Sequence, residues 1–356
     1  MKVASLKVHA VNVPMPQPHR TASGTVAVSP LVLIELGTSE GITGQSMLFS
    51  YSPGAHKPLA TLVENLAPLL QDQVVAPAAL SDALHARFRL LGTQGLVGMA
   101  LAGVDMALWD AHARALGRPL HEVLGGQARE LPAYAGIGFD GVQGSAQAAQ
   151  DWARKGFRAM KAKIGYPSLE EDIAVIRAMR EAAGPGVTLM VDYNQSLPPA
   201  EAARRLRVLD GEGLAWIEEP VLAHDYASLV RLSGQVRTPL QAGENWWGPL
   251  DFQHAFDAGV RGIAMPDAMK CGGVTGWQRI AATAAMRGVS LSSHLWPEVS
   301  AQLLCATPTA HWLEYTDWWN AVLREPLQVR DGLAQPTSAP GSGIDFDVDA
   351  VRRFSA

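Results

Sequence analysis

Two patterns of apolar and polar positions divide the chain. From Leu131 onward, short apolar runs alternate with segments of helical periodicity. This alternation is typical of a parallel sheet in which each strand is followed by a helix. One helix is well marked, because Ser168 and Glu171 have the spacing of a capping box, apolar residues follow on one face, and Gly184 ends it. We predict about seven strands with helices after most of them, and then a strand that ends at Glu314.

Residues 1–125 follow a different pattern, which predicts a separate α+β domain. The pattern predicts strands at 3–13 and 30–36. The segment between them, near 16–30, is rich in Pro, Ser and Thr, and its length favours a loop that acts as a lid. The Pro- and Gly-rich tail, 323–356, is expected to pack back on this domain. Helical patterns lie near 58–71, 78–90 and 97–116.

Three carboxylates suggest the chemistry of the second part. Asp192, Glu218 and Glu244 each end a short apolar run, and they follow one another at intervals of 26 residues. An eight-fold βα barrel has roughly 30 residues per strand-plus-helix unit, so the three carboxylates recur once per unit. They are expected at the carboxyl ends of successive strands, where such barrels build active sites. Three anions at one place repel each other unless a cation lies between them, and oxygen ligands favour Mg²⁺.

The same rhythm extends to four more polar residues, each of which closes an apolar run: Lys163, Asp267, His294 and Glu314. A single polar residue at a strand end is usually a helix cap or a surface group. Seven such residues in step with the barrel period argue against that interpretation and for one shared site.

Composition and charge bound the class of protein. The 356 residues are enough for a barrel and a smaller domain, and 48% hydrophobic with 18% charged residues is ordinary for a globular protein. A net charge of -5 and the lack of a Lys/Arg block give no reason to expect nucleic-acid binding. No apolar run approaches about 18 residues, so no membrane span is expected. The two cysteines form no disulfide framework, and the N-terminus lacks an apolar signal core, so the predicted location is the cytoplasm.

Two lysines are candidates for proton transfer. Lys161 and Lys163 are two residues apart in a predicted strand, so they point to the same face. Mutual repulsion is expected to lower the pKa of at least one of them, which would let it act as a general base. The alternative is a pair of surface lysines, which their place one unit before the carboxylates argues against. Lys270 is expected to pair with a carboxylate.

A histidine could serve as a second base. Asp267 and His294 end strands one unit apart, and an Asp that accepts from one imidazole nitrogen leaves the other free to exchange protons. Alone, His294 could simply cap a strand. Glu314 could bind a substrate oxygen or form a salt bridge with a barrel lysine, and both alternatives stay open. Asn194 points the same way as Asp192 and could bind a hydroxyl group. A cation, two bases and hydrogen-bond donors together would stabilise an enediolate made by removing the proton next to a carboxylate.

Long motifs relate the chain to a known family. They are MKAKIGYP, MVDYNQSL, WIEEP, GENWWGP, MPDAMKCGGVTGW, SSHL and ATPTAHWLE, with LAGVDMALWD and LGRPLHEVLGG in the first part. Over nearly its whole length the chain resembles the mandelate racemase branch of the enolase superfamily. In that superfamily a base removes a proton from the substrate and Mg²⁺ stabilises the enediolate that forms. The resemblance implies an α/β fold: an α+β capping domain (1–125), a modified TIM barrel, (β/α)7β (126–322), a C-terminal segment (323–356) and one Mg²⁺ per subunit.

The resemblance also implies roles for individual residues. Metal ligands are expected at Asp192, Glu218 and Glu244. One base is expected at Lys163, and the other at His294 with Asp267. The substrate carboxylate and hydroxyl are expected at Lys161, Asn194 and Glu314.

Several pocket positions depart from the family pattern. Gly136 stands where the pattern has a serine, and His19 and Arg20 stand where it has an apolar residue and a histidine. One interpretation is that the pocket is more polar than the family pattern, which argues against an aryl substrate. The other is that these residues lie outside the pocket and have changed without effect on the substrate. The substrate-binding residues expected on this basis are His19, Phe49, Tyr51, Leu90, Trp296 and Thr316.

Two activities fit these motifs, and both act on a small 2-hydroxy acid or acid sugar. The first is a racemase or epimerase, in which one base removes the α-proton and the other returns a proton to the opposite face. The second is a dehydratase of acid sugars, in which His294 helps the 3-hydroxyl group leave. A binding protein without activity would require a broken constellation, and none is broken. The resemblance implies self-association, because relatives are often homo-oligomers, and an octamer is among the expected assemblies.

Overall fold

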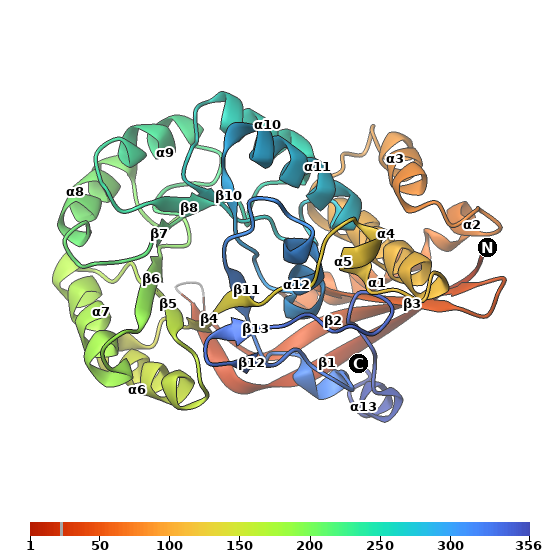
Figure 1. Cartoon of the computed structure of the whole chain (residues 1–356), viewed down its shortest axis with the longest axis horizontal. Helices are drawn as coiled ribbons and strands as arrows, with labels where there is room; N and C mark the ends of the chain where they lie inside the picture. Colours follow the sequence, from red (N-terminus) through yellow and green to blue (C-terminus); the bar gives the residue numbers. More distant parts are fainter. Residues whose placement is uncertain (22–23) are drawn as a thin grey trace.

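The capping domain is built on a long antiparallel hairpin. The computed structural model describes residues 1–21 and 24–356, and within them the strands of this domain are ordered β1-β2-β3. The bounds are β1 (Val3–Thr21), β2 (Gly24–Thr38) and β3 (Thr43–Phe49). The helices that follow are α1 (Pro53–Glu64), α2 (Ala67–Leu70), α3 (Pro77–Arg87), α4 (Gly95–Ala115) and α5 (Leu120–Val123). Most of α4 is buried, since this helix lies between the sheet and the second domain (Figure 1).

The first sheet corrects the expectation of a loop near 16–30. Strands β1 and β2 continue through most of that segment, and Ala22 and Ser23 lie outside the described residues. The register between the strands shifts between Pro14 and His19, where the prolines interrupt the ladder. The prolines that led us to expect a loop instead mark a register shift inside a hairpin. At its far end the hairpin contacts the barrel, because Phe139 N–H donates to the carbonyl of Arg20 at 2.8 Å.

The second domain is a modified TIM barrel. In the described part of the chain, parallel strands follow one another in sequence order from β4 to β10, and β11 pairs with β4. Backbone hydrogen bonds such as Ser293 N–H to Trp312 O, 2.9 Å, join the β10 and β11 sides and close the ring. The strands are β4 (Leu131–Ile137), β5 (Ala159–Lys163), β6 (Thr188–Asp192), β7 (Ile217–Glu218), β8 (Leu240–Ala242), β9 (Ile263–Ala264), β10 (Ser290–Leu291) and β11 (Leu313–Tyr315).

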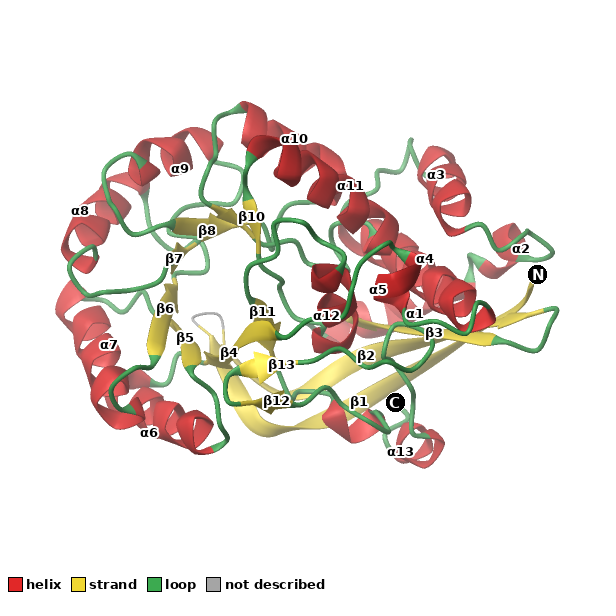
Figure 2. Cartoon of the chain, in the orientation of Figure 1, coloured by secondary structure: helices red, strands yellow, loops and turns green. Residues whose placement is uncertain are grey.

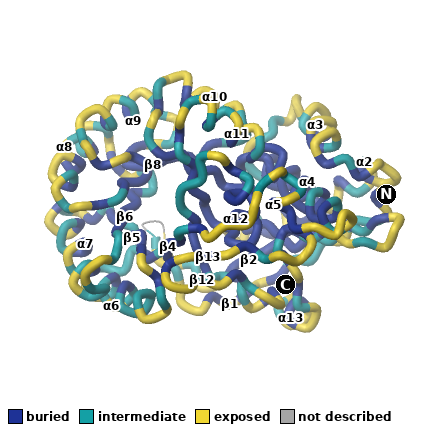
Figure 3. Tube along the Cα trace, in the orientation of Figure 1, coloured by how far each residue is buried: buried dark blue, intermediate teal, exposed yellow. Residues whose placement is uncertain are grey.

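Helices surround the ring of strands (Figure 2). The strands are buried and the outer sides of the helices are exposed (Figure 3). Ser168 and Glu171 form the predicted capping box of α7, and Gly184 ends that helix at φ 89°. The helices are α6 (Gly141–Arg154), α7 (Leu169–Ala183), α8 (Pro199–Leu209), α9 (Tyr226–Ser233), α10 (Gly248–Asp257), α11 (Gly273–Arg287) and α12 (Pro297–Cys305).

The C-terminal segment returns to the capping domain. It contains η1 (Asn320–Val322), β12 (Val329–Arg330), β13 (Leu333–Ala334) and α13 (Val348–Arg353). Asn12 N–H donates to Phe354 O at 2.8 Å, and Phe346 N–H donates to the side chain of Gln45 at 3.1 Å. Both termini consequently lie beside the capping domain (Figure 1). Among the described residues, no helix is long and apolar enough to cross a membrane.

Candidate active site and metal centre

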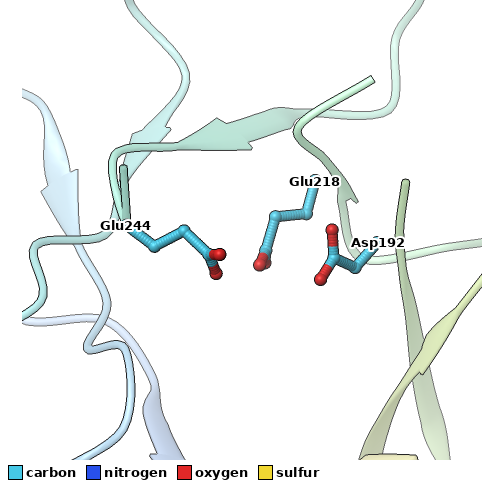
Figure 4. Close-up of side chains that lie close together, drawn as sticks. All are labelled: Asp192, Glu218 and Glu244. Carbon is cyan, nitrogen blue, oxygen red and sulfur yellow. The ribbon is translucent and has the colours of Figure 1, made fainter. Parts of the chain in front are cut away.

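Three carboxylates meet at the carboxyl ends of neighbouring barrel strands. Asp192 ends β6, Glu218 ends β7, and Glu244 follows β8 after Gly243. Parallel pairing places Asp192 beside Glu218, so the strand register itself brings the side chains together. The three side chains point toward one another (Figure 4), and one oxygen of each lies within 4.8 Å of the others.

The electrostatics of this cluster suit a cation. All three carboxylates are buried. Burial raises the pKa of Glu218 to about 8, and the negative charges of Asp192 and Glu244 add to this rise although Lys161 opposes it. A set of three carboxylate oxygens is the ligand type that Mg²⁺ prefers. The described residues therefore fit a magnesium site at the predicted positions.

Lys161 is buried and bridges two carboxylates. Its Nζ donates to Glu218 at 2.5 Å and lies 3.0 Å from Glu314 Oε1. Burial lowers the pKa of Lys161, but the charges of Glu218 and Glu314 outweigh burial and hold this pKa well above its usual value.

Lys163 lies on the metal side of the site. Its Nζ donates to Asp192 at 3.0 Å and to Asn194 at 2.6 Å. Burial lowers the pKa of Lys163, but the charges of Asp192 and Glu244 raise it by more, so the net direction is upward. The predicted lowering of a lysine pKa is thus wrong for the protein without a cation. Sequence reasoning weighed the two lysines against each other and could not see that each contacts a carboxylate of another strand.

The predicted Asp–His pair forms as expected from the spacing. His294 Nδ1 lies 2.6 Å from Asp267 Oδ2, and Asp267 is fully buried. His294 Nε2 faces the site and lies 3.1 Å from Glu244. Burial lowers the pKa of His294, whereas the charges of Glu244, Asp267 and Glu314 raise it, and the net direction is upward.

Glu314 forms one of the two contacts that its sequence left open, the salt bridge to a barrel lysine, while binding of a substrate oxygen stays a prediction. It forms the salt bridge to Lys161, and its Oε2 accepts the backbone N–H of Leu295 at 2.9 Å. Leu295 and Trp296 have φ angles of 51° and 54°, a left-handed conformation that is rare for such residues. This turn points the Leu295 N–H at the carboxylate.

A cavity of about 40 Å³ adjoins these residues. Its walls include the polar residues Lys161, Lys163 and His294 and the aromatic residue Trp318. His19 also lines the cavity, with its ring centroid 4.6 Å from that of Trp318. The buried Nε2 of His19 has no hydrogen-bond partner among the described residues. Burial and the charge of Lys163 lower the pKa of His19 to about 3, so its imidazole is neutral near pH 7.

The other predicted pocket residues divide into three groups. Thr316 lines the cavity. Phe49 and Tyr51 lie behind it and contact each other at 4.8 Å between ring centroids, with Phe49 also 5.9 Å from Trp318. Leu90 is wrong as a pocket residue of its own chain, because it is fully exposed beyond the end of α3.

Trp296 is also wrong as a wall of the pocket. Within the described ranges the cavity lining includes Leu295 but not Trp296. The indole of Trp296 is buried and donates to Asp267 Oδ1 at 2.9 Å. The left-handed turn directs it away from the cavity, and the sequence carries no signal for that turn.

Two further side chains were placed incorrectly or missed. Lys270 was expected to pair with a carboxylate, but its Nζ donates to Asn245 Oδ1 at 2.8 Å, and Asn245 in turn donates to Glu219 and Glu244. Trp318 was missed as a wall of the cavity, although the unusual EYTDWWN segment could have indicated it.

Comparison with known proteins identifies relatives over the whole chain. Residues 3–125 match the family model "Mandelate racemase / muconate lactonizing enzyme, N-terminal domain", and residues 144–351 match "Enolase C-terminal domain-like". An enolase from Bradyrhizobium, solved with magnesium and mandelic acid, is 43% identical with a TM-score of 0.95, covering 100% of this chain and 98% of that one. The D-galactarolactone cycloisomerase of Agrobacterium fabrum is 31% identical over 99% of both chains. The L-talarate/galactarate dehydratase of Salmonella typhimurium is 28% identical over 90% of this chain and 82% of its own.

Proposed function

The chain belongs to the mandelate racemase branch of the enolase superfamily, and on this premise we propose that it racemises or epimerises a 2-hydroxy carboxylate. The family shares Mg²⁺-dependent chemistry, while the relatives include cycloisomerases and dehydratases. The outcome of the reaction must therefore be argued from the bases and the pocket of this chain.

The observation that carries the proposal is a pair of bases on opposite sides of the barrel. Lys163 ends β5, whereas Asp267 follows β9 and His294 follows β10, across the ring from β5 (Figure 1). Both Lys163 and His294 line the same cavity. A substrate carbon between them presents one face to each base, which is the arrangement that inversion at that carbon requires.

Each residue has a part in the proton transfers. A cation held by Asp192, Glu218 and Glu244 supplies positive charge that stabilises negative charge on the substrate oxygens. Neutral Lys163 takes the α-proton from one enantiomer, and the electron pair of that bond moves into the substrate carboxylate to give an enediolate. Protonated His294 then gives its Nε2 proton to the opposite face, which completes the inversion, and the other enantiomer follows the reverse path.

The neighbours of the two bases keep them in position. Lys163 is fixed by hydrogen bonds to Asp192 and Asn194. Sharing Asp192 with a cation reduces the negative potential at Lys163 and so opposes the upward direction of its pKa. Asp267 accepts from His294 Nδ1, which leaves Nε2 as the nitrogen that exchanges protons. Lys161 lies beside Glu314 at the wall and supplies the positive charge for a substrate carboxylate.

The walls of the cavity support a substrate with an unsaturated or cyclic substituent. Trp318, Trp152 and Tyr315 line it together with Ile137. Flat aromatic walls favour flat apolar groups, which they bury over a large area. The Bradyrhizobium protein, 43% identical, binds mandelic acid, an aryl 2-hydroxy acid. We infer that an aryl 2-hydroxy acid is the first substrate class to test.

A dehydratase of acid sugars is the second candidate. Three polar residues, His19, Thr316 and Asp317, line the cavity beside the aromatic wall. The unpartnered Nε2 of His19 could bind a hydroxyl group beyond C2 of a polyol chain. The Salmonella relative is such a dehydratase. In that reaction the same enediolate loses its 3-hydroxyl group with a proton from His294.

Proton NMR in D₂O with Mg²⁺ distinguishes these reactions. Loss of the α-proton signal with the carbon skeleton intact, and appearance of the other enantiomer or epimer, is the expected result. A 2-keto-3-deoxy product would instead establish the dehydratase. The panel should hold both enantiomers of mandelate, other 2-hydroxy acids and a set of sugar acids.

Two variants test the roles of the bases. Lys163→Ala should lower α-proton exchange of one enantiomer by about 100-fold or more, and His294→Asn should do so for the other, because a general base contributes about 10² to 10⁴ in rate. Exchange is measured on each enantiomer separately. Lys57→Ala and His254→Asn, both exposed on helices outside the site, are the controls. Equal loss of both exchanges in both variants would contradict the two-sided arrangement.

A further inference from the structure

The carboxylate of Asp267 is surrounded by donors that occupy both of its oxygens. Oδ2 accepts from His294 Nδ1 at 2.6 Å. Oδ1 accepts the backbone N–H of Met269 at 2.7 Å and the indole N–H of Trp296 at 2.9 Å. Asp267 itself is fully buried, so water cannot replace a lost donor without entering the core. The indole is a side-chain donor from outside the pair, and the hydroxyl of Tyr51 also hydrogen-bonds to this carboxylate.

Trp296 is held in place by its own surroundings. It is 1% exposed, and its ring stacks on that of Trp319 with centroids 5.0 Å apart and planes inclined by 19°. Its backbone is left-handed at φ 54° and ψ 52° and directly precedes α12. The amide of Ser300 donates to its carbonyl at 2.8 Å, which ties the turn to the first residues of that helix. Strain of this kind persists only where the surroundings fix it, and it often serves a site.

We propose that Trp296 is a positioning residue for proton transfer by His294: its indole N–H holds the Asp267 carboxylate in the orientation that aims His294 Nε2 at the substrate. The proposal rests on the function proposed above. Because Trp296 and Met269 hold Oδ1, Oδ2 is the oxygen that accepts from the imidazole, and this sets the plane of the ring. Lys163 lies across the barrel and has no contact with this network among the described residues.

The geometry predicts a loss of activity on one side only. Trp296→Phe removes the N–H but keeps an aromatic ring on Trp319, so Asp267 loses one donor while the packing is largely kept. Exchange of the enantiomer that depends on His294 should fall by about 10- to 100-fold, as is common when a supporting hydrogen bond is removed. Exchange that depends on Lys163 should be largely kept, with KM for both enantiomers changed little. Both exchange rates are measured by NMR in D₂O.

Trp319→Phe is the matched control. Trp319 is 0% exposed and belongs to the same stack, and its indole N–H is directed at Glu298 and not at Asp267. Trp319→Phe removes the same side-chain volume as Trp296→Phe but leaves the hydrogen bond from Trp296 to Asp267 in place. The same one-sided loss in Trp319→Phe, or equal loss of both exchanges in Trp296→Phe, would overturn the proposal and assign the effect to packing.

A second measurement needs neither a substrate nor the Trp296 variant. The indole N–H resonance of Trp296, assigned in the wild-type protein, should lie downfield and should shift in Asp267→Asn, because its acceptor changes. A resonance that does not move would contradict the contact on which the proposal depends. If the wild-type protein exchanged no α-proton of any 2-hydroxy acid, the proposed function would fail, while this test would still decide whether Trp296 donates to Asp267.

Discussion

At the scale of single residues, the site holds more negative than positive charge. Asp192, Glu218 and Glu244 are buried together, and of the nearby cations Lys161 is already shared with Glu314. Each buried carboxylate loses hydration, and mutual repulsion adds to this cost. The pKa of about 8 at Glu218 is the result of that burial and repulsion. Binding of a divalent cation relieves both, so metal binding is expected to stabilise the fold.

Magnesium should therefore raise the thermal stability of the protein. At a concentration about 100 times the dissociation constant, a ligand that binds only the folded state stabilises it by about 2.7 kcal/mol. Glu218→Gln removes one ligand and should abolish most of this gain. Glu212→Gln is the control, because Glu212 forms a salt bridge with Arg177 on the outside of the barrel and is not a metal ligand. Thermal melts with Mg²⁺ and with a chelator measure the effect, and an undiminished gain in Glu218→Gln would contradict the metal assignment.

Sequence was sufficient for the residues whose position follows from the barrel period. Asp192, Glu218 and Glu244 fall together because strand ends of a parallel barrel meet at one face. The directions of the lysine pKa values could not be predicted, since they depend on carboxylates that neighbouring strands bring within 3.0 Å. Trp296 was misplaced for a similar reason, because a left-handed backbone turn reverses the side on which a residue appears.

At the scale of elements, the hairpin of β1 and β2 closes the site. Its residue His19 stands against Trp318, and both side chains line the cavity beside the barrel residues. The hairpin end is tied to the barrel by exposed contacts such as the Arg20–Asp140 ion pair, 3.1 Å, which contribute little to stability. The lid role that the sequence suggested stays a prediction, now for a hairpin in place of a loop.

Another element, α7, fixes the loop after β5. Asp172 of α7 is fully buried, and its Oδ1 accepts the backbone N–H groups of Gly165 and Tyr166 at 2.9 Å each. Its Oδ2 accepts from Arg205 at 2.7 Å and from the hydroxyl of Tyr193 at 3.0 Å. One carboxylate thus ties the loop that follows Lys163 to the residue that follows Asp192.

Asp172→Asn should both destabilise the protein and slow proton exchange. Removing one partner of a buried ion pair typically costs about 3–5 kcal/mol in free energy of unfolding. Loosening of the 164–166 loop should then lower kcat for the Lys163-dependent exchange. Glu201→Gln is the matched control, because Glu201 contacts the same Arg205 from the partly exposed side and does not touch the loop. Denaturant unfolding and exchange kinetics measure both effects, and an equal response of the two variants would contradict this role.

At the scale of the whole molecule, two buried aspartates of α4 tie the capping domain to later parts of the chain. Asp110 accepts from Gln45 N–H at 2.7 Å, from Arg114 at 2.6 Å and from Ser342 N–H at 2.6 Å, so it connects β3 and the C-terminal segment. Asp105 reaches the barrel instead. The two domains were separable in the sequence by their patterns, but these contacts were not predictable, because they join positions as much as 232 residues apart.

Asp105 makes the contact between domains sensitive to pH. It is 1% exposed and accepts the backbone N–H of Thr275 at 3.0 Å and the hydroxyl of Thr275 at 2.6 Å. Gly273, at φ +71°, lies so close that a Cβ there would collide with the carboxyl group. Burial raises the pKa of Asp105 to about 7, while hydrogen bonds from Thr275 oppose the rise. In the described structure no ion pair offsets this burial.

This raised pKa sets the sign of a stability change. Between pH 3.8, the ordinary pKa of the group, and about 7, the folded protein keeps a proton that the unfolded chain releases. Stability therefore falls as pH rises through this window, by up to about 4 kcal/mol from this group, and is level above it. Asp105→Asn carries no such proton, and its amide can still accept from the Thr275 N–H and donate to the Thr275 oxygen. Relative to wild type it should gain stability between pH 4 and pH 8, as measured by urea unfolding across that range. Asp82→Asn, in an exposed pair with Arg279 between α3 and α11, controls for the loss of one charge. Parallel curves for wild type and Asp105→Asn would mean that Asp105 is ionised in the folded protein throughout the range, and that the two domains meet at a charged rather than a neutral carboxyl group.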